Sequence, residues 1–173
     1  MPDLRAVFFV VGLMLAALGL AMFMPMVVDF KMGDRSWPAF AISGIFTTLV
    51  GAVLALTTYT PKPELPARAA FLLTVLSWVI LAAFAAIPFL LSPTKMTLTD
   101  ALFEAVSGIT TTGSTVMVGL DDQQKGVLLW RAILQWIGGV GIIVTAMAVL
   151  PMLRIGGMQL FRLESSGMGE RIL

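Results

Sequence analysis

Four long apolar stretches constrain the fold of this chain more than any other feature of its sequence. They run from Ala6 to Val28, from about Pro38 to Leu56, from about Ala69 to Leu91 and from about Val127 to Leu153. A helix needs about 20 apolar residues to cross the hydrocarbon layer of a membrane. Strands of a membrane barrel alternate apolar and polar residues, so these unbroken runs predict four spanning helices. The first run is longer than the apolar core of a signal peptide, so we expect it to be retained.

The residue types that are missing weaken most enzyme hypotheses. The chain has no cysteine and no histidine, which removes thiol nucleophiles, the commonest metal ligand and the usual general base. Only 12% of the residues are charged and the formal net charge is +1, so no basic surface is available to follow a nucleic acid backbone. We therefore expect a membrane protein that is not an enzyme and binds no nucleic acid.

The distribution of basic residues predicts the orientation. With a cytoplasmic N-terminus, the inner segments hold six basic residues and the outer segments four, which favours cytoplasmic N- and C-termini by the positive-inside rule. The inner residues are Arg5, Lys62, Arg68, Arg154, Arg162 and Arg171, and the outer ones are Lys31, Arg35, Lys95 and Lys125. The amphipathic tail Met158 to Leu163 predicts a helix at the cytoplasmic membrane surface.

A short helix is predicted between the third and fourth spans. In the stretch TDALFEAVSG, Thr97 or Thr99 can cap the N-terminus, Asp100 lies in the first turn and Gly108 can close the C-terminus. About ten residues are too few to cross a membrane, and this length is typical of a re-entrant or interfacial segment.

The stretch ITTTGSTV, from Ile109 to Val116, follows the short helix. An extended backbone within a membrane leaves carbonyl groups unpaired, which is tolerated where they line water or bind something. Rows of carbonyls can replace the hydration shell of a monovalent cation, and Gly113 can adopt the positive φ that this backbone needs. The other interpretation is an external loop with a surface helix and a glycine turn.

A family resemblance rests on three stretches, VSGITTTGSTV, WRAILQWIGGVGIIV and LPMLRIGGMQLFRLES. Together with the order of helices, they resemble the first pore repeat of the Trk/Ktr/HKT superfamily of potassium transporters, and most closely the bacterial Trk membrane subunit. The resemblance implies an all-α membrane protein with two leading transmembrane helices, followed by one helix–pore loop–helix unit of a potassium-channel-like fold. The implied domains are residues 1–66 for the leading helices, 67–155 for the repeat and 156–173 for a cytoplasmic interfacial tail.

The implied function is potassium uptake across the bacterial inner membrane through a selectivity filter of backbone carbonyls. The resemblance implies that Thr111, Thr112, Gly113, Ser114 and Thr115 are the filter positions, with Thr111, Thr112 and Gly113 as potassium ligands. Potassium is the implied bound ion, and no organic cofactor is expected. The implied partners are the remaining repeats of the same transporter, a second copy of the complete protein, a cytosolic nucleotide-binding regulatory subunit and the lipid bilayer.

One departure from the family pattern concerns completeness. A filter needs four loops around an axis and this chain contains one, so we expect an N-terminal fragment that carries one of four repeats. The alternative is a small four-span membrane protein that serves in interaction or assembly and has no transport activity.

A few further residues lead to hypotheses of their own. Arg131 lies within an apolar run, where we expect it to reach the membrane surface rather than act near a pore. Asp100 and Glu104 are expected to form an outward-facing, solvated pair. Trp130 is expected to anchor the helix at the membrane boundary. Gly138, Gly139 and Gly141 are expected to allow close helix packing rather than hinge motion.

Overall fold

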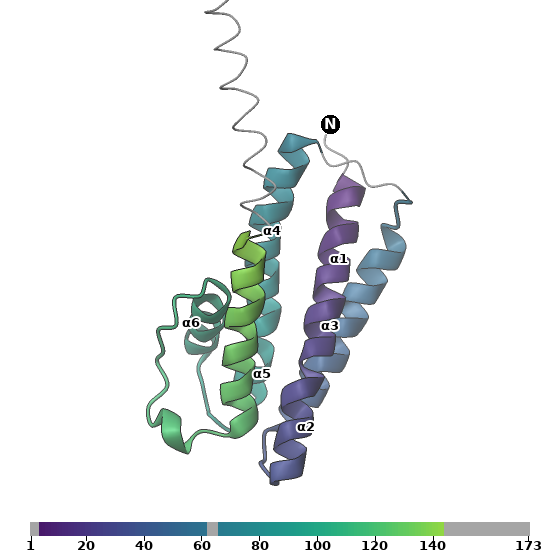
Figure 1. Cartoon of the computed structure of the whole chain (residues 1–173). Helices are drawn as coiled ribbons and strands as arrows, with labels where there is room; N and C mark the ends of the chain where they lie inside the picture. Colours follow the sequence, from purple (N-terminus) through teal and green to yellow (C-terminus); the bar gives the residue numbers. More distant parts are fainter. Residues whose placement is uncertain (1–3, 62–65, 144–173) are drawn as a thin grey trace, which may run out of the picture. The chain divides into compact units, whose positions relative to one another are not determined.

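The structure is a computed structural model that describes residues 4–61 and 66–143. By its internal contacts the chain divides into two compact units, Met1–Gly138 and Gly139–Leu173, and the description below concerns the first unit. Its elements are α1 (Leu4–Ala21), α2 (Phe23–Met32), α3 (Trp37–Thr57), α4 (Ala67–Ala85), α5 (Ile87–Leu91), α6 (Leu98–Ile109) and the short 3-10 helix η1 (Leu120–Asp122) (Figure 1). A last helix, Lys125–Ile143, runs to the end of the described residues, which include no strand.

Four helical stretches are long and apolar enough to cross a membrane, as the sequence predicts. They are Leu4–Met32, Trp37–Thr57, Arg68–Leu91 and Lys125–Ile143. The predicted extension of the fourth span to Leu153 and the predicted tail helix lie outside the described residues. The all-helical fold of a multi-pass membrane protein is therefore confirmed, while the predicted domain boundaries stay predictions.

The two leading spans pack with their backbones in contact. A Cβ atom added to Gly12 of α1 would lie 2.6 Å from the backbone nitrogen of Ala55 and 2.9 Å from the carbonyl oxygen of Gly51, both on α3. Glycine is needed here because any side chain would separate the helices. Small residues at such crossings allow the close van der Waals packing that holds helices together in lipid. The leading spans thus form one antiparallel helix pair (Figure 1).

Two prolines interrupt the first and third spans. Pro25 follows the junction between α1 and α2, and Pro88 follows the junction between α4 and α5. Proline lacks the N–H that would continue the helical hydrogen bonds, so the chain breaks about one turn before it.

The break between α4 and α5 receives the side chain of Trp130. The indole Nε1–H donates to the carbonyl oxygen of Ala85 at 3.0 Å, and Trp130 is 0% exposed. The expectation that Trp130 anchors the helix at the membrane boundary is therefore wrong. The broken helix provides a carbonyl acceptor inside the protein, and a buried indole N–H needs such a partner.

The short helix α6 begins as the sequence predicts but ends later. Thr97 and Asp100 form a reciprocal capping box, in which the Thr97 hydroxyl accepts from the Asp100 backbone N–H at 3.2 Å. The prediction that Gly108 ends the helix is wrong, because α6 continues through Ile109. Gly108 has a packing role instead: a Cβ atom there would lie 3.0 Å from Cβ of Leu134.

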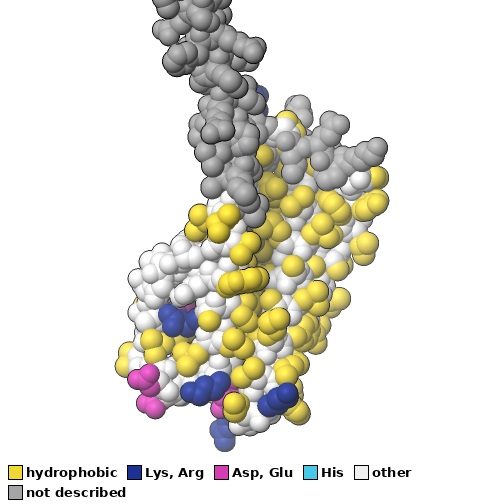
Figure 2. Space-filling view, viewed as in Figure 1, with side chains coloured by type: hydrophobic (Ala, Val, Ile, Leu, Met, Phe, Trp, Pro, Cys, Tyr) yellow, Lys and Arg dark blue, Asp and Glu magenta, His cyan; other side chains and the backbone are white. Residues whose placement is uncertain are grey.

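Charged and apolar surfaces are separated on this unit. Figure 2 shows hydrophobic side chains spread over the long helices, and a group of charged side chains at the lower end of the view. The exposed apolar residues include Leu49 and Val53 on α3 and Val75 and Val79 on α4. Apolar surface of this extent on helices of spanning length is typical of contact with lipid or with neighbouring spans.

Candidate functional site

The residues with filter-like sequence form an irregular segment after α6. Thr111, Thr112, Gly113 and Ser114 are exposed and Thr115 is partly buried. This 111–115 segment belongs to no helix, so its carbonyl groups have no helical partners.

Two positive φ angles shape the 111–115 segment. Gly113 has φ 77° and Thr111 has φ 58°. A β-branched residue is an outlier with positive φ, and such strain costs about 1–3 kcal/mol and clusters at functional sites. The sequence predicts the need for positive φ at Gly113 but contains no signal for it at Thr111.

Hydrogen bonds tie one part of the segment back to α6. The Ser107 hydroxyl donates to the Ser114 carbonyl oxygen at 2.6 Å, and the Gly113 N–H donates to the Ser107 carbonyl oxygen at 3.3 Å. Within the described residues no hydrogen bond reaches the carbonyl oxygens of the other four segment residues, which are Thr111, Thr112, Gly113 and Thr115. The segment therefore combines a fixed attachment with a set of available oxygen ligands.

Glu104 lies behind the C-terminal end of the segment and is 1% exposed. Its Oε1 atom accepts from the Thr115 hydroxyl at 2.5 Å and from the Val116 N–H at 2.7 Å. Its Oε2 atom accepts from Nε of Arg131 at 2.8 Å in an ion pair. The expectation of an outward-facing, solvated Glu104 is wrong, because this carboxylate is buried and fully engaged.

Arg131 is turned toward the protein by this ion pair. Its side chain is 14% exposed, so the expectation that it extends to the membrane surface is also wrong. A buried carboxylate requires a counter-charge or several donors, and Arg131 meets that need across 27 positions of sequence. The only signal in the sequence for this ion pair was the presence of one charged residue, Arg131, within an apolar run.

The end of α6 contacts the 125–143 helix at Gly138. A Cβ atom on Gly138 would overlap the carbonyl oxygen of Ile109 and lie 2.6 Å from its carbonyl carbon. The prediction of close packing is confirmed at Gly138, whereas a Cβ atom on Gly141 would meet no described atom within 4 Å. At about 1.5 Å per residue, Gly138 lies about 20 Å along the helix from Lys125. The C-terminus of α6 is therefore well removed from the charged start of that helix.

Asp29 connects the leading helices to the start of the 125–143 helix. Its carboxylate accepts from the Ser36 hydroxyl and from the Gly126 N–H, the latter at 2.5 Å. The first N–H groups of a helix have no partner within the helix, and an acidic group satisfies them well. A Cβ atom on Gly126 would overlap the Asp29 carboxylate, which explains the glycine.

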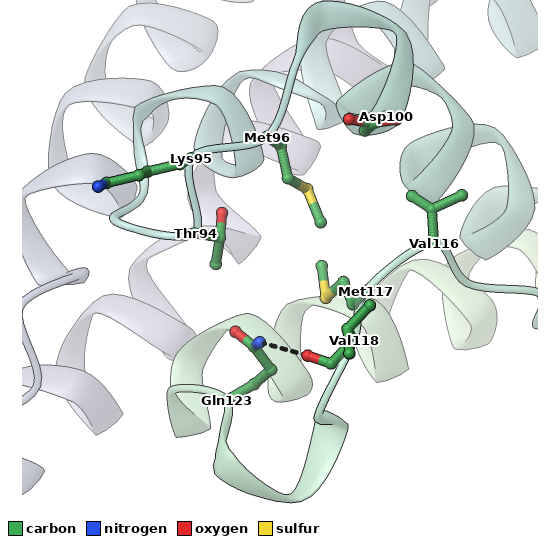
Figure 3. A pocket seen from close by; sticks show the side chains of 8 residues that line it. All are labelled: Thr94, Lys95, Met96, Asp100, Val116, Met117, Val118 and Gln123. Carbon is green, nitrogen blue, oxygen red and sulfur yellow. Dashed lines mark hydrogen bonds between the residues drawn. The ribbon is translucent and has the colours of Figure 1, made fainter.

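A pocket of about 280 Å³ lies beside the chain that leaves the 111–115 segment (Figure 3). None of the five segment residues lines it. Figure 3 shows Met96 and Met117 facing each other across it, while the Gln123 amide donates to the Val118 carbonyl at 3.1 Å. The lining residues are Thr94, Lys95, Met96, Asp100, Val116, Met117, Val118 and Gln123.

The available ligands suit a weakly hydrated cation bound by neutral oxygens. Among the described residues no group of three or more histidine, cysteine, aspartate or glutamate side chains could hold a metal ion. Carbonyl and hydroxyl oxygens of the 111–115 segment can replace water around a monovalent cation.

Comparison with known proteins gives consistent matches. Residues 36–169 match the TrkH family model, described as a cation transport protein. The Trk system potassium uptake protein TrkH of Salmonella typhimurium is 42% identical over 164 residues, which are 94% of this chain and 34% of that protein. The Trk system potassium uptake protein TrkI of Halomonas elongata is 40% identical over 165 residues, which are 95% of this chain and 33% of that protein.

A solved structure matches the fold as well. The crystal structure of the potassium transporter TrkH from Vibrio parahaemolyticus aligns with a TM-score of 0.82 at 40% identity, and covers 89% of this chain and 33% of that one. The chain therefore spans about a third of the length of the relatives it matches.

Proposed function

Because this chain belongs to the TrkH family of cation transport proteins, as its sequence predicts, we propose that it supplies one wall of a potassium-selective pore. In this proposal, carbonyl oxygens of the 111–115 segment bind dehydrated potassium ions during uptake. Thr111, Thr112 and Gly113 provide the main ligands, and Ser114 and Thr115 complete the five filter positions. The chain acts as a transporter subunit, with no catalytic role.

The observation that carries the proposal is the backbone of this segment. Positive φ at Thr111 and Gly113, two residues apart, turns the chain away from a regular strand. Four carbonyl oxygens are free of hydrogen bonds within the described residues, which is costly within a membrane unless they have another partner. A cation that has lost part of its hydration shell is such a partner.

The position of α6 gives further support. The carbonyl group of its last residue, Ile109, lies beside Gly138, about 20 Å along the 125–143 helix from Lys125. The C-terminal end of a helix carries partial negative charge, which favours a cation nearby. In this proposal, α6 and the irregular 111–115 segment that follows it together form a re-entrant pore loop.

The complete transporter is proposed to need parts beyond this chain. A ring of four such loops surrounds a filter, and further repeats of the complete protein would supply the other three. We propose a bacterial inner-membrane location with cytoplasmic termini, a dimer of complete subunits and a cytosolic nucleotide-binding regulatory partner. The matched relatives are potassium uptake proteins of the Trk system by name, which supports the transport role in this proposal.

The test compares two glycines with similar positive φ angles in the complete protein. Gly113 has φ 77° and Gly33 has φ 74°, and an added Cβ atom meets only Gln135 Nε2 at 3.6 Å in the first case and nothing within 4 Å in the second. Alanine therefore adds a similar conformational penalty, about 1–2 kcal/mol, at both sites.

Potassium-limited growth and ion competition are measured in an uptake-deficient strain. We expect Gly113→Ala to reduce growth at low potassium and the preference for potassium over sodium, whereas Gly33→Ala leaves the preference intact. Unchanged growth and preference for Gly113→Ala would reject the filter assignment.

A further inference from the structure

We propose that Glu104 is a positioning residue for ion selection, holding the C-terminal end of the 111–115 segment through Thr115 and Val116. This inference rests on the proposed function and goes beyond the five filter positions. It assigns ion selectivity in part to a buried carboxylate that never touches the ion.

The contacts of Glu104 join three parts of the chain. Glu104 itself lies on α6; Thr115 is the last residue of the 111–115 segment and Val116 follows it; and Arg131 belongs to the 125–143 helix. Each bond is 2.8 Å or shorter. Hydrogen bonds that involve an ionised group are stronger and more directional than neutral ones. The C-terminal end of the segment is therefore fixed relative to two helices at once.

Other attachments of the segment are weaker or lie elsewhere. The Ser107 hydroxyl holds the Ser114 carbonyl oxygen, and Thr110 and Thr112 share a hydroxyl contact at 2.8 Å near the N-terminal end. Neither of these contacts involves an ionised group. Since a selective site depends on the spacing of its oxygens, loss of the Glu104 contacts at the C-terminal end is expected to change ion preference.

Arg131 has a distinct part in this arrangement. It balances the charge of Glu104, so the carboxylate serves as a hydrogen-bond acceptor without leaving an unpaired negative charge beside the ion path. In Glu104→Gln an amide replaces one oxygen. If the amide nitrogen faces Arg131, two donors meet there; if it faces Val116, that N–H loses its acceptor. Either orientation breaks one side of the network.

The chain offers a closely matched control in Asp29. Like Glu104, it is a buried carboxylate that accepts from one hydroxyl and one backbone N–H, here Ser36 and Gly126. It lies on α2, apart from the 111–115 segment. Asp29→Asn therefore reproduces the loss of a buried carboxylate without touching the segment.

The experiment measures potassium uptake by the complete protein carrying Glu104→Gln, Thr115→Val, Asp29→Asn or Gly113→Ala. Thr115→Val keeps the Glu104–Arg131 pair and the side-chain shape but removes the hydroxyl. Uptake rates are measured over a range of potassium concentrations, which gives the apparent KM, and are normalised to the amount of protein in the membrane, which gives the maximal rate per protein. Sodium competition then gives the ion preference.

We expect Glu104→Gln and Thr115→Val to raise the apparent KM for potassium about tenfold, the order expected when charge-assisted hydrogen bonds are lost, and to weaken the preference over sodium. Asp29→Asn should lower the amount of protein and leave KM and preference unchanged. If Glu104→Gln does not reach the membrane, Thr115→Val decides alone.

Two results would overturn the inference. One is an apparent KM and an ion preference that stay unchanged in Thr115→Val, and also in Glu104→Gln if that protein is recovered. The other is a change of KM and preference in Asp29→Asn as large as that in the Glu104 and Thr115 variants. If Gly113→Ala changes the ion preference while Glu104→Gln and Thr115→Val do not, the filter assignment is retained and the proposed role of Glu104 is rejected. If Gly113→Ala is also silent, the proposed function itself fails.

Discussion

Two glycines at the contact between α6 and the 125–143 helix provide a quantitative test of the packing. Gly108 faces the Leu134 side chain, and Gly138 faces the Ile109 backbone. An alanine at either position adds the same methyl group to the same interface. The two substitutions differ only in what that group meets.

The structure predicts different costs. The added Cβ would lie 3.0 Å from Leu134 Cβ in Gly108→Ala. In Gly138→Ala it would overlap the Ile109 carbonyl oxygen and lie 2.6 Å from the carbonyl carbon. Because carbon atoms pack best at about 3.5–4.0 Å, the shortfall is about 0.5 Å in the first case and about 1 Å in the second. Because Leu134 Cβ is attached directly to its backbone, Gly108→Ala requires the two helices to separate by the smaller amount, whereas Gly138→Ala requires the α6 backbone to move by the larger one.

Overpacking of this kind costs about 1–3 kcal/mol, and replacing glycine with alanine in a helix returns about 1 kcal/mol. We therefore expect Gly108→Ala to be nearly neutral and Gly138→Ala to destabilise the protein by about 1–2 kcal/mol. Because the displaced part is the end of α6, Gly138→Ala should also weaken the preference for potassium.

The assay is thermal unfolding of the purified complete protein in detergent, paired with uptake and sodium competition in cells. Gly108→Ala serves as the control for the chemistry of the substitution. Equal stability of the two variants, or a normal preference in Gly138→Ala, would refute the reasoning that backbone contact at Ile109 positions the segment.

Three further substitutions test single contacts. Trp130→Phe leaves the Ala85 carbonyl without its donor and should lower the thermal stability of the complete protein by about 1–3 kcal/mol; a melting curve like that of the parent would contradict this. Thr97→Ala removes the N-cap of α6 and should cost about 1 kcal/mol locally, seen as faster hydrogen exchange in its first turn; unchanged exchange would argue against the capping box. Ser36→Ala removes one donor to Asp29 and should destabilise the start of the 125–143 helix by about 1 kcal/mol, measured by hydrogen exchange, with ion preference preserved; a changed preference would contradict a purely structural role.

Local signals account for the parts of the fold that the sequence predicts. The four spans follow from run length and the scarcity of charge, since these unbroken apolar runs can satisfy their backbone in lipid only as helices. The start of α6 follows from Thr97 and Asp100, whose capping bonds join residues three positions apart. Gly113 follows from the chemistry of one residue, which accepts positive φ without strain.

The candidate site needed more than local signals. Glu104 and Asp100 are one helical turn apart and look alike in sequence, yet Asp100 caps α6 while Glu104 is buried beneath the outgoing chain. From the sequence, Trp130 and Arg131 were likewise expected to lie at the membrane boundary. Their partners lie 45 and 27 positions away, which no local pattern reveals.

The sequence by itself thus determined which stretches become membrane helices, where the short helix begins and where an irregular, oxygen-rich segment follows it. These properties depend on hydrophobicity, capping and backbone preference, all of which act within a few residues. Only the tertiary structure decided which face of each helix turns inward. That choice buried Glu104 against Arg131, because a carboxylate withdrawn from water is stable only where another part of the chain brings a counter-charge and donors to it.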